Sequence, residues 1–284
     1  MVHGLCVVDK PAGMTSHDVV AVCRRQLGER RVGHAGTLDP DATGVLLVGV
    51  GSVTRLMRFL SGTNKSYEGQ VVLGVETNTL DAAGEVTARY DMAVTVDEVR
   101  RAVGEHLVGA IEQVPPMVSA LKVGGRRLHE LAREGVEVER APRPVTVHRF
   151  DVEPTADPLV YRVAVDCSAG TYIRSLAADL GHLLGGGAHL RALRRTAVGS
   201  FTAAEARPLD ALELLAPRLA VRDLAAVVVD PPTATRVAHG AVLDRPDDGA
   251  DGPWAVLDAG GELLAVYEAH GTATVKPAVV LSAG

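Results

Sequence analysis

Residues 31–44 read RVGHAGTLDPDATG and stand directly before an apolar, strand-like run. Gly33, Gly36 and Gly44 allow positive φ angles or a close approach of backbone. Pro40 fixes its own φ and restricts the residue before it, so the carboxylate of Asp39 is held in a defined place. A loop of this kind is costly to order, which indicates a chemical task. From spacing alone, an Asp that caps a turn beside glycines is an equally good interpretation.

The segments around this loop predict a mixture of helices and strands. Thr15 begins a helix that runs to about Gly28, and Thr95 has the capping-box spacing with Glu98 at the start of a second helix. A third helix is expected near 172–184. Strands are expected near 4–9, 67–75, 143–152, 159–168 and 189–202. The pattern is typical of an α+β fold.

The pattern of predicted elements changes after Pro208. A helix is expected near 208–219, followed by short β runs with a turn at 259–262. We therefore divide the chain into a large domain, 1–205, and a small, mainly β domain, 206–284.

Length and composition narrow the class of protein. A chain of 284 residues with 47% hydrophobic content can bury one large core and a second small one. Cys6, Cys23 and Cys167 lack paired spacing, which argues against a disulfide framework and a zinc site. The longest apolar run is well below the roughly 20 residues that cross a bilayer. These features predict a cytoplasmic protein without a membrane segment.

The net charge of −6 argues at first against a nucleic-acid partner, but the charge is unevenly distributed. Residues 205–284 hold 6 of the 29 basic and 12 of the 35 acidic side chains, so residues 1–204 carry 23 of each. Within that neutral part, basic residues gather in three clusters, Arg24, Arg25, Arg30 and Arg31; Lys122, Arg126, Arg127 and Arg133; Arg191, Arg194 and Arg195. Each cluster alone is typical of a solvated face, whereas three together favour an anionic partner.

The loop and three further motifs resemble one family. GHAGTLDPDATGVL resembles the catalytic loop of the TruB-type tRNA pseudouridine synthases. KSY at 65–67, QVPPMVSALK at 113–122 with GRR at 125–127, and GTYIR at 170–174 ahead of DLG at 179–181 resemble the same family in the same order. The resemblance implies an α+β catalytic core with a mixed, largely antiparallel sheet and a C-terminal domain similar to PUA modules.

The resemblance also implies an activity, the isomerisation of uridine 55 in the T loop of tRNA to pseudouridine. This reaction breaks the glycosidic bond, turns the uracil over and rejoins it through carbon 5, so no cofactor or metal is expected. Asp39 is the family's catalytic aspartate by position and acts as a nucleophile or a base. The expected partner is the T arm of tRNA, and a monomer without an obligatory protein partner is expected.

The resemblance implies the remaining site residues as well. Arg174 is expected to pair with Asp39, and an adjacent Arg typically lowers an Asp pKa. Tyr67 is expected to stack on the target base and to help in proton transfer. A uridine in a folded loop must be flipped out, and His34 is placed to fill the gap. Further substrate-binding residues are expected to be Tyr172, Leu193, Lys10, Lys65, Lys122, Arg126 and Arg127.

Three other functions stay open. An RNA-guided synthase would need protein partners and a guide RNA, and a tRNA-folding chaperone would need no chemistry. A hydrolase that uses Asp39 and Asp41 as an acid–base pair is disfavoured, because acids two residues apart on one loop are poorly set to flank a bond.

Overall fold

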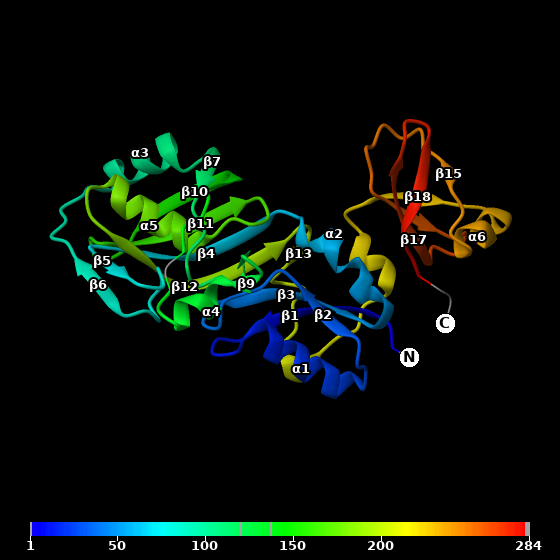
Figure 1. Cartoon of the computed structure of the whole chain (residues 1–284), viewed down its shortest axis with the longest axis horizontal. Helices are drawn as coiled ribbons and strands as arrows, with labels where there is room; N and C mark the ends of the chain where they lie inside the picture. The colour runs from blue at the N-terminus through cyan, green and yellow to red at the C-terminus, as the bar shows by residue number, and fades with distance from the viewer. Residues whose placement is uncertain (1, 120, 137, 282–284) are drawn as a thin grey trace.

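The computed structural model describes residues 2–119, 121–136 and 138–281, and only the backbone of Lys122, Val123, Arg127, His129, Ala132 and Arg133. A nine-stranded sheet dominates the first two thirds of the chain (Figure 1). Its order is β1-β3-β12-β4-β11-β10-β7, with β2 on β3 and β13 on β12. The strands are β1 Gly4–Lys10, β2 Val32–Ala35, β3 Thr43–Val50, β4 Lys65–Leu73, β7 Gly109–Gln113, β10 Arg143–Pro154, β11 Val160–Cys167, β12 Ala188–Val198 and β13 Phe201–Thr202.

Only the pairing of β3 with β12 is parallel in this sheet, as far as the described residues go. The α+β class and the mixed, largely antiparallel sheet are therefore confirmed.

The main helices begin where the sequence predicts. Helix α1, Ser16–Leu27, has Thr15 as its N-cap in a capping box with Asp18, and it ends at Gly28 in the left-handed conformation. Helix α3, Val96–His106, has the predicted box of Thr95 with Glu98. Helix α5, Ile173–Leu183, packs with α3 on the core of the large sheet.

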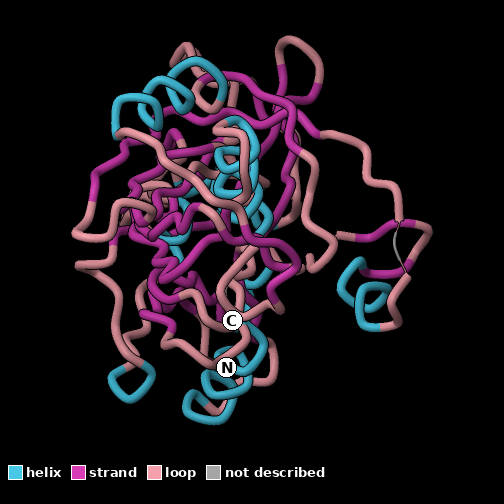
Figure 2. Tube along the Cα trace, turned by 90° about the vertical axis from the view of Figure 1, so that its left-hand side faces the viewer, coloured by secondary structure: helices cyan, strands magenta, loops and turns pink. Residues whose placement is uncertain are grey.

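Shorter elements join these parts. A projecting segment formed by β8, β9 and α4 stands out from the sheet in the view of Figure 2. The short elements are η1 Gly51–Leu56, α2 Met57–Ser61, β5 Val75–Thr77, β6 Val86–Arg89, β8 Lys122–Val123, β9 Arg126–Arg127 and α4 Leu128–Arg133.

A second sheet lies at the C-terminal end of the chain, as predicted. It has five strands in the order β14-β16-β17-β18-β15, with one short helix, α6 Pro231–Ala238. Its strands are β14 Ala225–Val228, β15 Leu243–Asp244, β16 Trp254–Leu257, β17 Leu263–His270 and β18 Thr274–Val280. Val266 and Val279 share an apolar cluster with Leu5 and Leu47 of the large sheet, so the two sheets pack through side chains.

The predicted helix near 208–219 is wrong. This stretch forms two short 3-10 turns, η2 Leu209–Ala211 and η3 Pro217–Val221. Between them, Leu5 and Leu215 exchange backbone hydrogen bonds of 3.0 and 2.8 Å. The open edge of β1 needs hydrogen-bond partners, and this pairing outweighs the local helical pattern. The predicted domain boundary at 205/206 falls just before this segment.

Among the described residues, no helix is both long and apolar enough to cross a membrane.

Candidate active site

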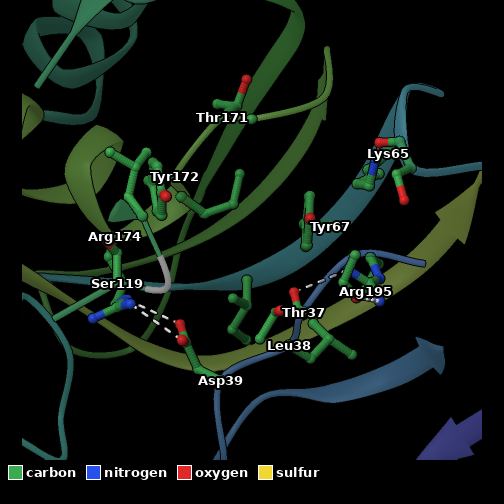
Figure 3. A pocket seen from close by; sticks show the side chains of 16 residues that line it. Thr37, Leu38, Asp39, Lys65, Tyr67, Ser119, Thr171, Tyr172, Arg174 and Arg195 are labelled. Carbon is green, nitrogen blue, oxygen red and sulfur yellow. Dashed lines mark hydrogen bonds and ion pairs between the residues drawn. The ribbon is translucent and has the colours of Figure 1, made fainter. Parts of the chain in front are cut away.

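A cavity of about 380 Å³ opens where the β2–β3 loop meets the start of α5 (Figure 3). The β2–β3 loop supplies one wall, β4 and β12 supply the floor, and the residues just before α5 supply the opposite wall. The cavity is lined by Gly36, Thr37, Leu38, Asp39, Ser61, Lys65, Tyr67, Ser119, Leu121, Gly170, Thr171, Tyr172, Ile173, Arg174, Leu193 and Arg195.

The loop that carries Asp39 is fixed by buried side chains. Ser16, at the start of α1, accepts a hydrogen bond from the Leu38 amide (2.9 Å) and donates one to the Leu38 carbonyl (3.2 Å). Lys10 donates to the Pro40 carbonyl at 2.8 Å. The residues on both sides of Asp39 are therefore held, and the carboxylate has little freedom to move.

Arg195 fixes the beginning of the same loop. Its guanidinium is buried and donates to the carbonyls of Val45 (2.7 Å), Gly36 (3.1 Å) and Thr37 (3.4 Å). The β12 backbone approaches Gly44 so closely that a Cβ there would lie 2.2 Å from the Arg195 carbonyl oxygen. Gly44 is thus required both by this approach and by its φ of +101°.

Asp39 and Arg174 contact one another at one side of the cavity (Figure 3). Arg174 Nε lies 2.9 Å from Asp39 Oδ2, and Nη2 donates to Oδ1 at 3.1 Å, which is a bidentate contact. The remaining guanidinium hydrogens reach the carbonyls of Thr79 (2.8 Å) and Val118 (2.9 Å). Arg174 is only 4% exposed, so its orientation is set by these partners.

A second acid shares Arg174. Asp81 Oδ2 lies 3.4 Å from Arg174 Nη1. Burial is the largest influence on Asp39 and raises its pKa above the ordinary 3.8, whereas Arg174 lowers this pKa and Asp81 raises it. The expected lowering by Arg174 is therefore outweighed, because removal from water acts more strongly on this carboxyl group.

Tyr67 lies on β4 opposite Arg195 of β12 and points into the cavity. Burial raises the pKa of its hydroxyl, and the neighbouring Arg195 lowers it in part. The phenol is therefore neutral, and Tyr67 lines the cavity together with Asp39.

Lys65 lies two residues before Tyr67 and also lines the cavity. It donates to the carbonyls of Ser61 (3.0 Å) and Thr63 (2.7 Å). Burial, followed by the charge of Arg195, lowers the pKa of Lys65 to about 8. These two bonds use two of the three hydrogens of the charged ammonium group.

Tyr172 and Leu193 complete the walls. The Gln113 side chain accepts from the Tyr172 amide (2.7 Å) and donates to the Tyr172 carbonyl (3.1 Å), which fixes the entry to α5. Leu193 lies in an irregular part of β12, between Arg191 and Arg194, where the register with β4 shifts. Both residues line the cavity, as expected.

His34 lies on β2 and not among the residues that line the cavity. Its ring meets that of His17 edge-on, with centroids 5.3 Å apart. Burial, then His17 and Arg195, lower the pKa of His34 to about 4, so the ring is neutral near pH 7. Its half-buried ring has no hydrogen-bond partner for Nδ1 within the described part of the chain.

The basic residues predicted to bind substrate have different surroundings. Lys10 is fully buried and its ammonium donates to the carbonyls of Pro11, Met14 and Pro40, so it has no hydrogen left for RNA and that prediction is wrong. Arg126 is exposed and paired with Glu134. The side chains of Lys122 and Arg127 lie outside the described residues.

Sequence reasoning missed Ser16, Asp81 and Arg195. The sequence places Arg195 in a basic cluster that favours an anionic partner, because nothing in the neighbouring residues indicates that its side chain points inward. Asp81 could have been suspected from its place between Asn78 and Gly84, where an acid in a polar turn is otherwise ordinary. No sequence signal marks Ser16 beyond its place at the start of a helix.

Comparison with known proteins agrees with this site. A model described as the N-terminal domain of TruB family pseudouridylate synthase matches residues 24–173, which is more than half of the chain. This chain belongs to the TruB family. The C-terminal domain model of tRNA pseudouridylate synthase B matches residues 174–226 of the TruB-family chain.

Relatives support the assignment over almost the whole length. tRNA pseudouridine synthase B of Arthrobacter sp. (strain FB24) is 45% identical over 99% of this chain and 97% of that protein. The protein of the same name from Mycobacterium sp. (strain KMS) is 48% identical over 98% and 96%. The TruB-family chain is therefore an enzyme of tRNA modification, a pseudouridine synthase.

Solved structures share the fold. The TM-score is 0.75 with a chain of a Cbf5-Nop10-Gar1 complex, at 27% identity over 99% of this chain and 84% of that one. It is 0.72 with a chain of an H/ACA RNP bound to a substrate RNA containing 2'-deoxyuridine, at 26% identity over 97% and 83%.

Proposed function

We propose that the enzyme converts uridine 55 in the T loop of tRNA to pseudouridine and that Asp39 carries the reaction. The observation that supports this most directly is the bidentate contact of Asp39 with Arg174 at the edge of a cavity that also holds Tyr67. A carboxylate held in this way can attack or take up a proton without first reorganising its surroundings.

The reaction assigns work to each group. The glycosidic bond from C1' of the ribose to N1 of the uracil breaks, C1' bonds to C5, the C5 proton leaves and N1 gains a proton. Asp39 serves as a nucleophile or as a base in these steps, and both roles need its ionised form. Arg174 keeps Asp39 in place, Tyr67 stacks on the uracil, and Tyr172 and Leu193 enclose it.

The base must leave the folded loop before it reaches this cavity. Base flipping costs a few kcal/mol, and an aromatic side chain that takes the vacated place recovers about 1–3 kcal/mol. His34 suits this role because its ring is neutral and lies on the strand that leads into the Asp39 loop. Lys65, at the start of β4, suits a contact with the flipped nucleotide inside the cavity.

We propose further that the enzyme acts as a cytoplasmic monomer, without a cofactor, guide RNA or obligatory protein partner. All three cysteines are free and buried, which suits a reducing compartment. The similar structure with a TM-score of 0.75 is part of a Cbf5-Nop10-Gar1 complex, and those partners belong to that protein. An assay without guide RNA distinguishes a stand-alone synthase from an RNA-guided one.

The test uses purified enzyme and an unmodified tRNA transcript with nothing else added. Carbodiimide-stop mapping should find pseudouridine at position 55 and nowhere else. Asp39→Asn should bind the tRNA and make no product, whereas Asp41→Asn, which removes an exposed acid from the same loop, should stay active. Turnover by Asp39→Asn would move the chemistry to another residue, and a product at a different uridine would refute the T-loop assignment.

A further inference from the structure

The three basic clusters that the sequence contains have different surroundings in the structure. Arg126 is paired with Glu134, Arg194 is paired with Asp9 at 2.9 Å, and Arg195 is buried. In the third cluster, Arg191 donates to the Gln70 side chain. The first cluster lies at the end of α1. We call Arg24, Arg25 and Arg30 the α1 cluster.

The α1 cluster is exposed and not neutralised. Its three arginines surround a shallow hollow of about 460 Å³ together with Ala21, Gly28 and Glu29. Within the described ranges none of the three forms an ion pair, and Arg24 donates only to the Val32 carbonyl. Three arginines and one acid, Glu29, line the hollow, so its net charge is positive and attracts a phosphate.

The cluster lies on the face of the large sheet that holds the active site. Arg195 is opposite Tyr67 on β4 and opposite Gly44 on β3, so these side chains and positions share one face. Alternate residues of a strand keep the same face, which assigns Leu46 and Val48 to it as well. Helix α1 packs on these two residues through Val19, Val20 and Cys23.

Helix α1 also determines how far the α1 cluster lies from the loop that carries Asp39. Its first residue, Ser16, is hydrogen-bonded to Leu38, the neighbour of Asp39. Arg24 and Arg25 follow Ser16 by eight and nine residues, and at about 1.5 Å per residue this places them roughly 12–14 Å along the helix from the end that contacts Leu38. At roughly 3.4 Å per base-pair step, this distance is on the order of four steps of a duplex. A phosphate bound there belongs to the stem and not to the flipped nucleotide.

We propose that Arg25 and Arg30, supported by Arg24, bind the phosphate backbone of the paired stem that presents the target loop. This inference rests on the proposed function, because it takes the uridine at Asp39 as its origin. Arg suits the contact because its planar fork binds phosphate oxygens in pairs, and duplex RNA is recognised mainly through its backbone and shape. Through these contacts, the enzyme binds a loop attached to an intact stem more tightly than the loop sequence alone.

The test compares two double variants on two RNAs. Arg25→Ala/Arg30→Ala removes the contacts, and Arg58→Ala/Arg162→Ala is the matched control, since both control arginines are exposed and paired with Glu268 and Glu153. The RNAs are a stem-loop with the complete T stem and the single-stranded loop sequence alone. Dissociation constants are measured over a series of salt concentrations, and the conversion rate is measured at saturating enzyme.

On the stem-loop, the first variant should bind more weakly, and its slope of log affinity against log salt should be smaller in magnitude by about 1.8, or 0.9 for each lost contact. On the loop sequence it should match the wild type, and its saturated conversion rate should be unchanged. An unchanged slope on the stem-loop, or an equal loss on both RNAs, would overturn the proposal. If the wild type fails to modify the stem-loop while the slope still changes, the target assignment fails and the phosphate site stands.

Discussion

Removal of the Ser16 hydroxyl should disturb the Asp39 loop without touching the cavity itself. Ser16 is 1% exposed and is the hydrogen-bond partner of both the amide and the carbonyl of Leu38. Ser16→Ala leaves these two groups buried and unsatisfied, at about 1–2 kcal/mol each. Ala is the better helix former by about 0.5 kcal/mol, which offsets part of the loss. We expect a net destabilisation of about 2–3 kcal/mol, or a fall in Tm of roughly 3–5 °C.

The effect on catalysis should be larger than the loss of stability suggests. Asp39 follows Leu38 directly, and a displacement of about 1 Å in a reacting group can cost about 100-fold in rate. The single-turnover rate of Ser16→Ala, measured by tritium release from labelled tRNA well below its Tm, should therefore fall by about 10- to 100-fold with little change in tRNA affinity.

A control separates the two effects. Asp230→Ala removes the cap of α6, where the Asp230 side chain accepts from the Thr233 amide at 2.8 Å. It should destabilise the protein by about 1 kcal/mol and leave the rate unchanged. A normal rate for Ser16→Ala, combined with the expected loss of stability, would refute the argument that this hydroxyl positions Asp39.

Three further outcomes follow from the site. Arg174→Lys should bind tRNA but lose at least about 100-fold in single-turnover rate, because an ammonium group cannot make the bidentate contact with Asp39; a near-normal rate would contradict this. Tyr67→Phe should keep tRNA affinity in filter binding and slow the reaction, whereas Tyr67→Ala should lower both; the same affinity for the two variants would count against stacking. Since burial raises the pKa of Asp39 above 3.8, its carboxylate is lost as the pH falls through that raised value. The rate–pH profile should therefore decline on its acid side at a pH above 3.8, and a flat profile there would exclude Asp39 as the titrating group.

The helices that the sequence predicts best are those with complete local signals. Thr15 and Thr95 each make a capping box with an acid three residues on, and both boxes form. The segment after Pro208 lacks such a signal and has a strong tertiary competitor, the unpaired edge of β1. Local pattern decides the structure only where no distant partner competes for the same backbone groups.

The candidate site also divides into residues whose place the sequence predicts and residues whose place depends on distant segments. Asp39, Tyr67 and Arg174 come together as the motifs predicted, because each stands in a run of residues that resembles the family. The burial of Lys10 and Arg195 could not be predicted, since a basic residue with carbonyl partners has the same sequence signal as one on the surface. The direction of the Asp39 pKa shift was missed for a related reason, because burial depends on the packing of segments far apart in the chain.

Backbone strain beside the cavity is the part of the site that sequence reveals least. Among the residues that the structure describes, two non-glycine residues have left-handed φ angles, Leu80 at 62° and Ala192 at 54°. Leu80 stands between Thr79 and Asp81, which both contact Arg174, and Ala192 precedes Leu193 in the irregular part of β12.

Such conformations cost about 1–3 kcal/mol each and persist only where the surroundings impose them. Here the Leu190 amide donates to the Leu80 carbonyl (3.0 Å), and the Ala82 amide donates to the Leu190 carbonyl (2.9 Å), so each strained segment is held by the other. The segment with Leu80 directs Thr79 and Asp81 toward Arg174, and the segment with Ala192 directs Leu193 into the cavity. Leu80 and Ala192 thus contribute a backbone angle rather than a functional group, which is why no motif of reactive side chains could have singled them out.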